Sequence, residues 1–175
     1  MGGADKPLLL HRGQPMVQHV LRAMQPFVSE VLISANRNLD AYAALAPVVT
    51  DAPRSSQGPL TGVLRGMETT RCEWLWVCPG DAPLLRSELL SRLAGQTARA
   101  RVVTAHDGTR NQWLHMLVHT SLREALASYL DGGGYSVHRW LHSLPAHTHQ
   151  TVRCADISAS FLNINQAEDL EGETS

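Results

Sequence analysis

Two aspartates in this sequence follow short apolar runs, where acids that bind metals or substrates are often found. Asp81 comes after the apolar residues 74–78, and the motif Pro79-Gly80-Asp81-Ala82-Pro83 favours a rigid turn around it. A carboxylate there can hold Mg²⁺, which keeps several waters and bridges to substrate phosphates. The same spacing fits an aspartate that only shapes its turn or caps a helix equally well.

Asp51 follows residues 47–50, a second run with the composition of a strand. Its carboxylate can accept hydrogen bonds from a base or a ribose, or it can shape the turn in which it lies. The motif Gly58-Pro59-Leu60-Thr61-Gly62 then places small residues and a proline at the start of an expected helix. Small residues there allow a ligand to approach the helix closely, and they allow close packing of helix on sheet as readily.

The first residues, Met1-Gly2-Gly3-Ala4-Asp5-Lys6, combine two glycines with a lysine. Glycines let a backbone approach phosphate groups closely, and a lysine shortly afterwards can neutralise their charge. By themselves, Gly2 and Gly3 are more simply explained as a flexible end. Lys6 therefore becomes a candidate only if other loops point to the same ligand.

These candidate residues need secondary structure to position them, and strand and helix signals alternate along the chain. We expect helices at residues 15–24, 39–45, 59–70, 87–93, 122–130 and 135–144, and strands at 31–33, 47–50, 74–78, 101–105, 114–118 and 161–164. This alternation predicts an α/β fold with a mostly parallel sheet and helices on both faces. Ligands bind beyond the carboxyl ends of such strands, which points to the loops after Ile33, Thr50 and Cys78.

Size and composition exclude several other classes of protein. The chain has 175 residues, of which 43% are hydrophobic, so we expect a single domain over residues 1–175 with a sizeable core. A net charge of −1 provides no positive field for nucleic acid, and the apolar runs are too short to span a membrane. The three cysteines form no Cys-x-x-Cys pair, which favours a reducing, cytoplasmic location.

Taken in order, these segments resemble the molybdenum cofactor guanylyltransferase family, whose members open with a glycine-rich motif that ends in Asp-Lys. The residues from Met1 to Lys6 resemble the second half of that motif. The resemblance continues through Gly13-Gln14-Pro15-Met16, Ser34-Ala35-Asn36-Arg37-Asn38, Asp51, Gly58-Pro59-Leu60-Thr61-Gly62-Val63, Pro79-Gly80-Asp81-Ala82-Pro83 and Phe161-Leu162-Asn163-Ile164-Asn165. It spans nearly the whole chain, and the ordered set of motifs is specific.

The resemblance implies a Rossmann-like nucleotidyltransferase fold and a definite reaction. The GMP portion of GTP would be joined to the phosphate of molybdopterin, with release of pyrophosphate. GTP and molybdopterin would be the substrates, Mg²⁺ the cofactor, and molybdoenzyme chaperones or other proteins of cofactor biosynthesis the further partners.

The resemblance also assigns roles to residues. Lys6 would neutralise the phosphates of GTP, and Asp81 would hold Mg²⁺ on them, which makes these two the catalytic residues. The nucleotide would be bound by Ser34 and Asp51 and by the glycine-rich turn at Gly2 and Gly3. Either Asn163 or Asn165 would lie near the metal.

The sequence also departs from the family's pattern. Ser34 stands in place of an asparagine, and Tyr135 and Ser136 replace basic residues. Met1 coincides with a methionine inside the family's opening motif, so the family's first strand and the first half of its glycine-rich turn would precede it. We therefore expect a fold in which that strand is missing, with low stability and weak activity.

Two alternatives stay open on the sequence. A cytidylyltransferase for the same cofactor would share most of these motifs, because the base-selecting loop lies partly before residue 1. A relative without catalytic activity would bind the pterin or a partner protein and would be indifferent to Asp81→Ala. Competition between GTP, CTP and ATP separates the first alternative, and the Asp81 variant separates the second.

Overall fold

The structure, a computed structural model, describes residues 5–51 and 58–163 of the chain. Within them the strands are β1 (Leu10–His11), β2 (Gln14–Pro15), β3 (Ile33–Ser34), β4 (Val48–Val49), β5 (Trp74–Val77), β6 (Val102–His106), β7 (Asn111–His119) and β8 (His149–Arg153). The α-helices are α1 (Met16–Met24), α2 (Leu39–Ala43), α3 (Pro59–Thr69), α4 (Glu88–Ala94), α5 (Arg123–Asp131) and α6 (Val137–Ser143). The 3₁₀ helices are η1 (Lys6–Leu8), η2 (Gln25–Phe27), η3 (Thr120–Leu122) and η4 (Ala155–Phe161).

The six helices expected within the described residues are confirmed, each within two residues of its expected bounds. A further short helix, which the acidic sequence from Ala167 predicts, lies outside the described residues. The local reasons are visible in α3, which Pro59 opens in its first turn after Gly58 at a φ of +102°. Leu60, Val63 and Met67 then recur at helical spacing and are buried. In the described part of the chain, no helix has the length and apolar character needed to cross a membrane.

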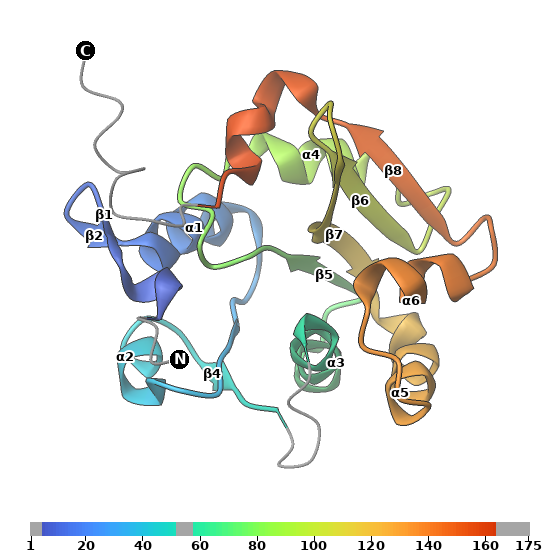
Figure 1. Ribbon diagram of the computed structural model, residues 1–175, viewed down its shortest axis with the longest axis horizontal. Coiled ribbons are helices and arrows are strands. Elements are labelled where there is room, and N and C mark those ends of the chain that lie inside the picture. Colours follow the sequence, from blue (N-terminus) through green and yellow to red (C-terminus); the bar gives the residue numbers. More distant parts are fainter. Residues whose placement is uncertain (1–4, 52–57, 164–175) are drawn as a thin grey trace.

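The strands do not form one continuous sheet (Figure 1). β5, β7, β6 and β8 make a four-stranded sheet in that order, in which β7 pairs antiparallel with β5 and β6, and β8 pairs parallel with β6. β3 and β4 form a parallel pair of their own, and β1 and β2 a small hairpin. In the four-stranded sheet, β5, β6 and β8 run in one direction as expected, and β7 alone is reversed.

The reversal of β7 has a local cause. A tight turn joins β6 to β7, and the carboxylate of Asp107 accepts hydrogen bonds from the backbone N–H groups of Thr109 and Arg110 at 2.7 and 2.8 Å. Gly108 adopts a φ of +105° inside this turn. A connection this short can only join antiparallel strands, because a parallel connection needs a crossover of a dozen residues or more.

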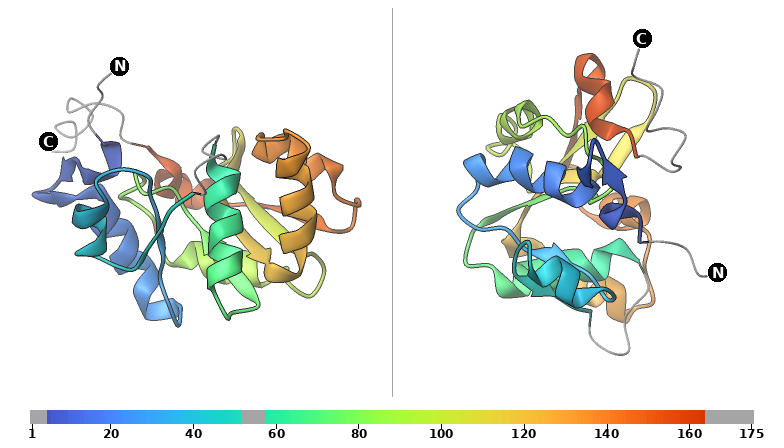
Figure 2. Two further views of the ribbon diagram at one scale, coloured as in Figure 1. Left: turned by 90° about the horizontal axis from the view of Figure 1, so that it is seen from below. Right: turned by 90° about the vertical axis from the view of Figure 1, so that its left-hand side faces the viewer.

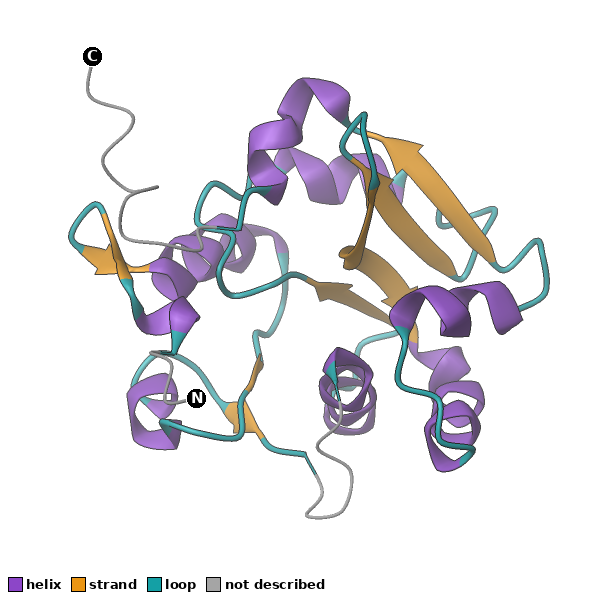
Figure 3. Ribbon diagram, viewed as in Figure 1, coloured by secondary structure: helices purple, strands orange, loops and turns teal. Residues whose placement is uncertain are grey.

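Helices cover both faces of the four-stranded sheet, as expected (Figure 3). One face packs on α1, α4 and η4 through residues such as Leu89 and Phe161. The other face packs on α3, α5 and α6 through residues such as Leu126, and Figure 2 shows α3 and α5 side by side. Val102 and Val103, both fully buried, belong to opposite faces because successive side chains of a strand alternate.

An apolar cavity of about 540 Å³ lies between the β3–β4 pair and β5. β5 is an edge strand of its sheet and does not pair with β3. The cavity is lined by both strands and by the helices above and below them, through residues that include Val17, Ile33, Val63 and Trp76. We call this cavity the strand gap, because it has a strand edge on each side and apolar helices on both faces.

The strand gap explains the partial burial of β5. A continuous apolar run such as residues 74–78 is typical of a strand buried on both faces, yet Trp76 is the only buried residue of β5. The other residues of the strand are half-buried because its outer edge faces the gap.

The carboxyl-terminal part of the described chain differs further from the expected pattern. The expected strand at 161–164 is wrong for its described residues, because Phe161 ends η4 and no strand follows through Asn163. η4 buries Ile157 and Phe161 at helical spacing, and an apolar cluster with this spacing suits a helix against a sheet face. The strand that does close the sheet, β8, is mostly polar and exposed, so its sequence gave little strand signal.

Candidate active site

The segments that carry Lys6 and Asp81 meet at the strand gap, which Pro7 and Gly80 both line. Their chain neighbours, Pro7 and Gly80, pack so tightly that a Cβ placed on Gly80 would lie 3.2 Å from the Cβ of Pro7. The glycine therefore permits the contact between the turn after β5 and η1. Asp81 is partly exposed and makes no hydrogen bond or ion pair to any residue that the structure describes. Its carboxylate is free to bind a ligand.

Asp5 fixes the start of η1 to the loop after β3. Its carboxylate accepts hydrogen bonds from Arg37 at 3.2 Å and from the side-chain amide of Asn38 at 2.9 Å. Burial and the neighbouring charge of Asp5 together raise the pKa of Tyr42, which packs beneath. Asp5 directly precedes Lys6, and no motif in the sequence points to a role for it. The structure shows that it holds the segment that carries Lys6.

Asp51 is held by several hydrogen bonds, through both its side chain and its backbone. Its side chain accepts hydrogen bonds at Oδ2 from the Asn36 amide at 2.8 Å and from the Thr61 hydroxyl at 3.0 Å. Its backbone N–H donates to Asn36 Oδ1 at 2.9 Å. Its other oxygen, Oδ1, is buried and has no partner among the described residues. A buried acceptor without a partner is costly in the free protein and suits a ligand that donates to it.

Ser34 lies against the first turn of α3, across the strand gap from β5. A Cβ on Gly62 would clash with the Ser34 hydroxyl and would lie 3.0 Å from the Ser34 Cβ, so the glycine is required for this approach. Gly58, at the start of the same helix, packs against the backbone carbonyl of Tyr135. The small residues of this motif therefore serve close packing, the simpler of the two readings of the sequence.

The structure thus arranges the segments that carry four of the candidate residues around the strand gap. Its lining includes Pro7, Ser34, Gly62 and Gly80, which belong to those segments or to α3. Asn36 and Thr61, which touch Asp51, lie inside motifs that the sequence analysis quoted without giving them roles. They could have been found there as polar residues flanking the candidate positions.

The remaining candidates are less completely placed. Asn163 is exposed and follows the end of η4 by two residues. Gly2, Gly3 and Asn165 lie outside the described residues, so their predicted roles stay predictions.

The carboxylate of Asp81 suits Mg²⁺, which takes few protein ligands, better than it suits a metal ion that is coordinated by protein side chains alone. Among residues 5–51 and 58–163, no three histidine, cysteine or acidic side chains are grouped as a metal site. Mg²⁺ commonly takes one or two carboxylates from the protein and completes its shell with water and substrate phosphates. The unpartnered carboxylate of Asp81, one residue from the contact with η1, offers a ligand of that kind.

Comparison with known proteins identifies the family. The MobA-like NTP transferase domain matches residues 1–150. A molybdenum cofactor guanylyltransferase of Shewanella piezotolerans is 36% identical over 171 residues, which cover 96% of this chain and 82% of that protein. The corresponding protein of Cupriavidus metallidurans is 36% identical over 97% of this chain and 86% of its own length.

Solved structures show the same fold at lower sequence identity. The molybdopterin-guanine dinucleotide biosynthesis protein A of Archaeoglobus fulgidus has a TM-score of 0.77 at 18% identity, over 97% of this chain and 88% of its own. The 2-C-methyl-D-erythritol 4-phosphate cytidylyltransferase of Thermus thermophilus has a TM-score of 0.68 at 16% identity, over 96% and 91%. The expected nucleotidyltransferase fold is therefore confirmed, and the chain belongs to the molybdenum cofactor guanylyltransferases, within the MobA-like NTP transferase family.

Proposed function

We propose that this protein transfers the GMP portion of GTP to the phosphate of molybdopterin and releases pyrophosphate. The observation that carries the proposal is the strand gap, around which the segments that carry Asp51, Ser34, Lys6 and Asp81 are arranged, in a chain that is 36% identical to named guanylyltransferases. Ser34, Asp51 and Asp81 lie at or after the carboxyl ends of β3, β4 and β5, where ligands of α/β sheets bind.

The nucleoside part of GTP binds at Asp51. Its Oδ1 is buried and has no partner in the described structure, whereas Oδ2 is held by Asn36 and Thr61. The fixed carboxylate therefore presents one acceptor to an N–H or O–H donor of the base or the ribose. The Ser34 hydroxyl, held close to α3 by Gly62, adds a second polar contact on the same side.

The phosphates bind between Lys6 and Asp81. The charge of Lys6 neutralises them, and Asp5 holds the segment from which Lys6 projects. Asp81 and one of the asparagines after η4 hold Mg²⁺, which when bound stabilises the negative charge on the phosphate oxygens. This arrangement needs no covalent intermediate on the protein.

In the reaction, an oxygen of the molybdopterin phosphate attacks the α-phosphorus of GTP. The bond between the α-phosphorus and the oxygen that bridges to the β-phosphate breaks, and pyrophosphate leaves with that oxygen. The protein contributes mainly by holding both substrates in line and by offsetting charge.

Calorimetric titration with GTP, CTP and ATP in the presence of Mg²⁺ tests the nucleotide assignment. We expect binding of GTP alone, and Asp51→Asn should weaken it by about tenfold or more, because the anionic acceptor is lost. Asp131→Asn, an exposed change at the end of α5, is the matched control and should bind GTP like the parent protein. Preferential binding of CTP would favour the cytidylyl alternative.

Release of pyrophosphate from GTP and molybdopterin tests the reaction itself. Asp81→Asn should lower the rate by about a hundredfold, the scale of losing one group that offsets charge in the transition state. Pterin binding without GTP binding, together with indifference to Asp81→Asn, would support the alternative of a relative without catalytic activity.

A further inference from the structure

The 3₁₀ helix η4 leads directly to Asn163 and holds that segment in place. It leaves β8 at the far edge of the four-stranded sheet and returns toward the loop after β5. Two sets of contacts anchor it, one buried and one exposed, and both reach the segment that follows Asp81.

The buried contact is made by Ser160, which has no exposed surface. Its hydroxyl accepts a hydrogen bond from the backbone N–H of Arg86 at 3.2 Å. From the other side, the imidazole of His115 on β7 lies against the end of η4. The ring of Phe161 meets that imidazole edge-on, with 4.9 Å between ring centroids. The end of η4 is therefore fixed to both β7 and the loop after β5.

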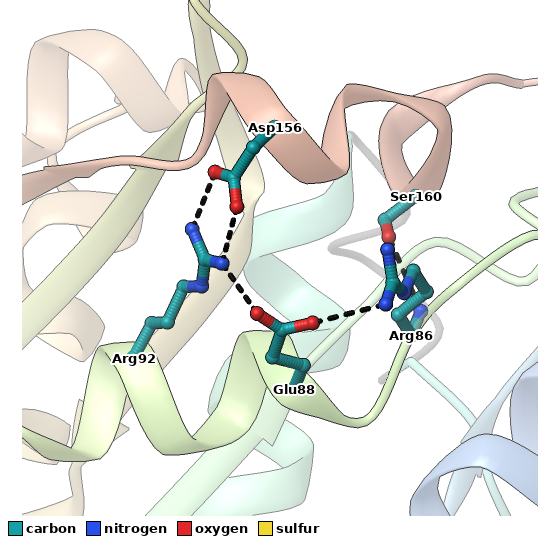
Figure 4. Close-up of polar contacts among 5 residues, drawn as sticks. All are labelled: Arg86, Glu88, Arg92, Asp156 and Ser160. Carbon is teal, nitrogen blue, oxygen red and sulfur yellow. Dashed lines mark hydrogen bonds and ion pairs between the residues drawn. The ribbon is translucent and has the colours of Figure 1, made fainter.

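The exposed contact is a network of ion pairs (Figure 4). Arg92 on α4 binds the carboxylate of Asp156 through two hydrogen bonds of 2.6 Å, and it also contacts Glu88. Glu88 in turn pairs with the Arg86 side chain at 3.1 Å. Ion pairs this exposed contribute little and are screened by salt, so the buried contact of Ser160 sets the geometry.

The position of Arg86 is linked to that of Asp81, because the chain between them is held in place by burial and a backbone hydrogen bond. Ala82 has no exposed surface, Leu85 is buried, and the N–H of Leu85 donates to the carbonyl of Ala82 at 3.1 Å. Arg86 follows Asp81 by five residues, and Ser160 precedes Asn163 by three. The hydrogen bond from Arg86 to Ser160 therefore joins the segment that carries Asp81 to the segment that carries Asn163.

From this juxtaposition we infer that Ser160 is a positioning residue, which sets Asn163 at the correct distance from Asp81 for one Mg²⁺ to be shared with the nucleotide. His115 contacts Phe161, the residue after Ser160, from the sheet. The inference rests on the proposed function, because it assumes that Asp81 and Asn163 serve the same metal. Ser160 itself touches neither metal nor substrate.

Binding of Mn²⁺, a spectroscopic substitute for Mg²⁺, in the presence of GTP tests the inference without any turnover. Ser160→Ala should weaken Mn²⁺ binding by about tenfold, the scale on which residues that support metal ligands act. Asn163→Ala should weaken it by a similar factor. The double variant Ser160→Ala/Asn163→Ala should bind no more weakly than Asn163→Ala alone, because Ser160 acts only through Asn163.

A matched serine separates positioning from a general loss of structure. Ser143 on α6 also hydrogen-bonds the backbone, through the carbonyl of Trp140, but it is far along the chain from both metal-binding segments. Ser143→Ala should leave Mn²⁺ binding unchanged. If Ser160→Ala does not fold, His115→Gln carries the same test, since it removes the ring contact with Phe161 beside Ser160 and leaves the hydrogen bond to Arg86 in place.

The outcomes distinguish this inference from the proposed function. If Asp81→Asn leaves Mn²⁺ binding intact, the metal site itself is wrong and the inference fails with it. If Asp81→Asn abolishes Mn²⁺ binding while the losses at Ser160 and Asn163 simply add, the metal site stands and the positioning role of Ser160 is overturned.

Discussion

The four-stranded sheet and the β3–β4 pair show how differently two parts of one fold can be packed. In the sheet and its helices, Leu93, Val102 and Met116 have no exposed surface, and helices cover both faces. In the β3–β4 pair, Ile33 is the only buried strand residue, and the pair faces the strand gap. Most of the packing energy therefore belongs to the first region.

The candidate active site nevertheless uses both regions. Asp81 and the start of α3 belong to the well-packed sheet, whereas Lys6, Ser34 and Asp51 belong to segments on the other side of the strand gap. The geometry of the site therefore depends on the β3–β4 region, whose strands are less buried than those of the four-stranded sheet. Changes that close or open the gap should therefore affect stability and nucleotide binding together.

Matched core substitutions give the largest expected contrast. Leu93 is fully buried under the four-stranded sheet, whereas Leu21 lines the strand gap. Leu93→Ala should lower the free energy of unfolding by about 4 kcal/mol, and Leu21→Ala by about 2 kcal/mol, because contacts are already missing on the gap side. Urea denaturation measures both losses. Equal values would show that the residues around the strand gap are packed as well as those under the four-stranded sheet.

Filling the strand gap should have the next largest effect. An apolar strand of about five residues added in front of residue 1 should raise the free energy of unfolding by about 3 kcal/mol, because burial of its side chains exceeds the cost of ordering them. The melting temperature should then rise by roughly 6–12 °C. A polar extension of the same length is the control, and equal melting of the two would show that no strand enters the gap.

Pushing the two regions apart should have a smaller effect. Gly62→Ala forces a Cβ against Ser34 and should cost about 2 kcal/mol of stability, with weaker GTP binding. Gly95→Ala is the matched control, since a Cβ at that position meets nothing closer than 3.5 Å and its φ is −59°. Calorimetry and melting curves compare the variants. Unchanged GTP binding by Gly62→Ala would show that the position of β3 does not affect the nucleotide site.

The smallest expected effect is a pH dependence that belongs to the well-packed region. Burial lowers the pKa of His115 to about 4, whereas an unfolded histidine titrates near pH 6.5. Below pH 6.5 the unfolded state binds a proton that the folded state does not, so stability should fall by about 1 kcal/mol between pH 6.5 and 5.5. His115→Gln should reduce this slope in urea denaturation, leaving the contribution of His149, whose pKa burial also lowers. The exposed variant His147→Gln should keep the full slope.

Prediction from the sequence succeeded where local pattern and burial agree. The helices were found because their apolar residues recur at helical spacing, as in α3 and α5. β8 gave no signal because an edge strand with polar residues lacks a hydrophobic pattern, and the strand expected at 161–164 is wrong for its described residues because Phe161 ends η4. In both places the deciding contacts come from residues far away in the sequence.

The sequence by itself determined the family, the helices and the chemical types at the site, because these depend on residue identity and order. Only the tertiary structure decided that Asp51 keeps one oxygen without a partner, that Asp5 anchors the segment of Lys6, and that Ser160 ties η4 to the loop after Asp81. Such contacts join residues tens of positions apart, and their geometry follows from how the sheets and helices pack. No local pattern records that packing.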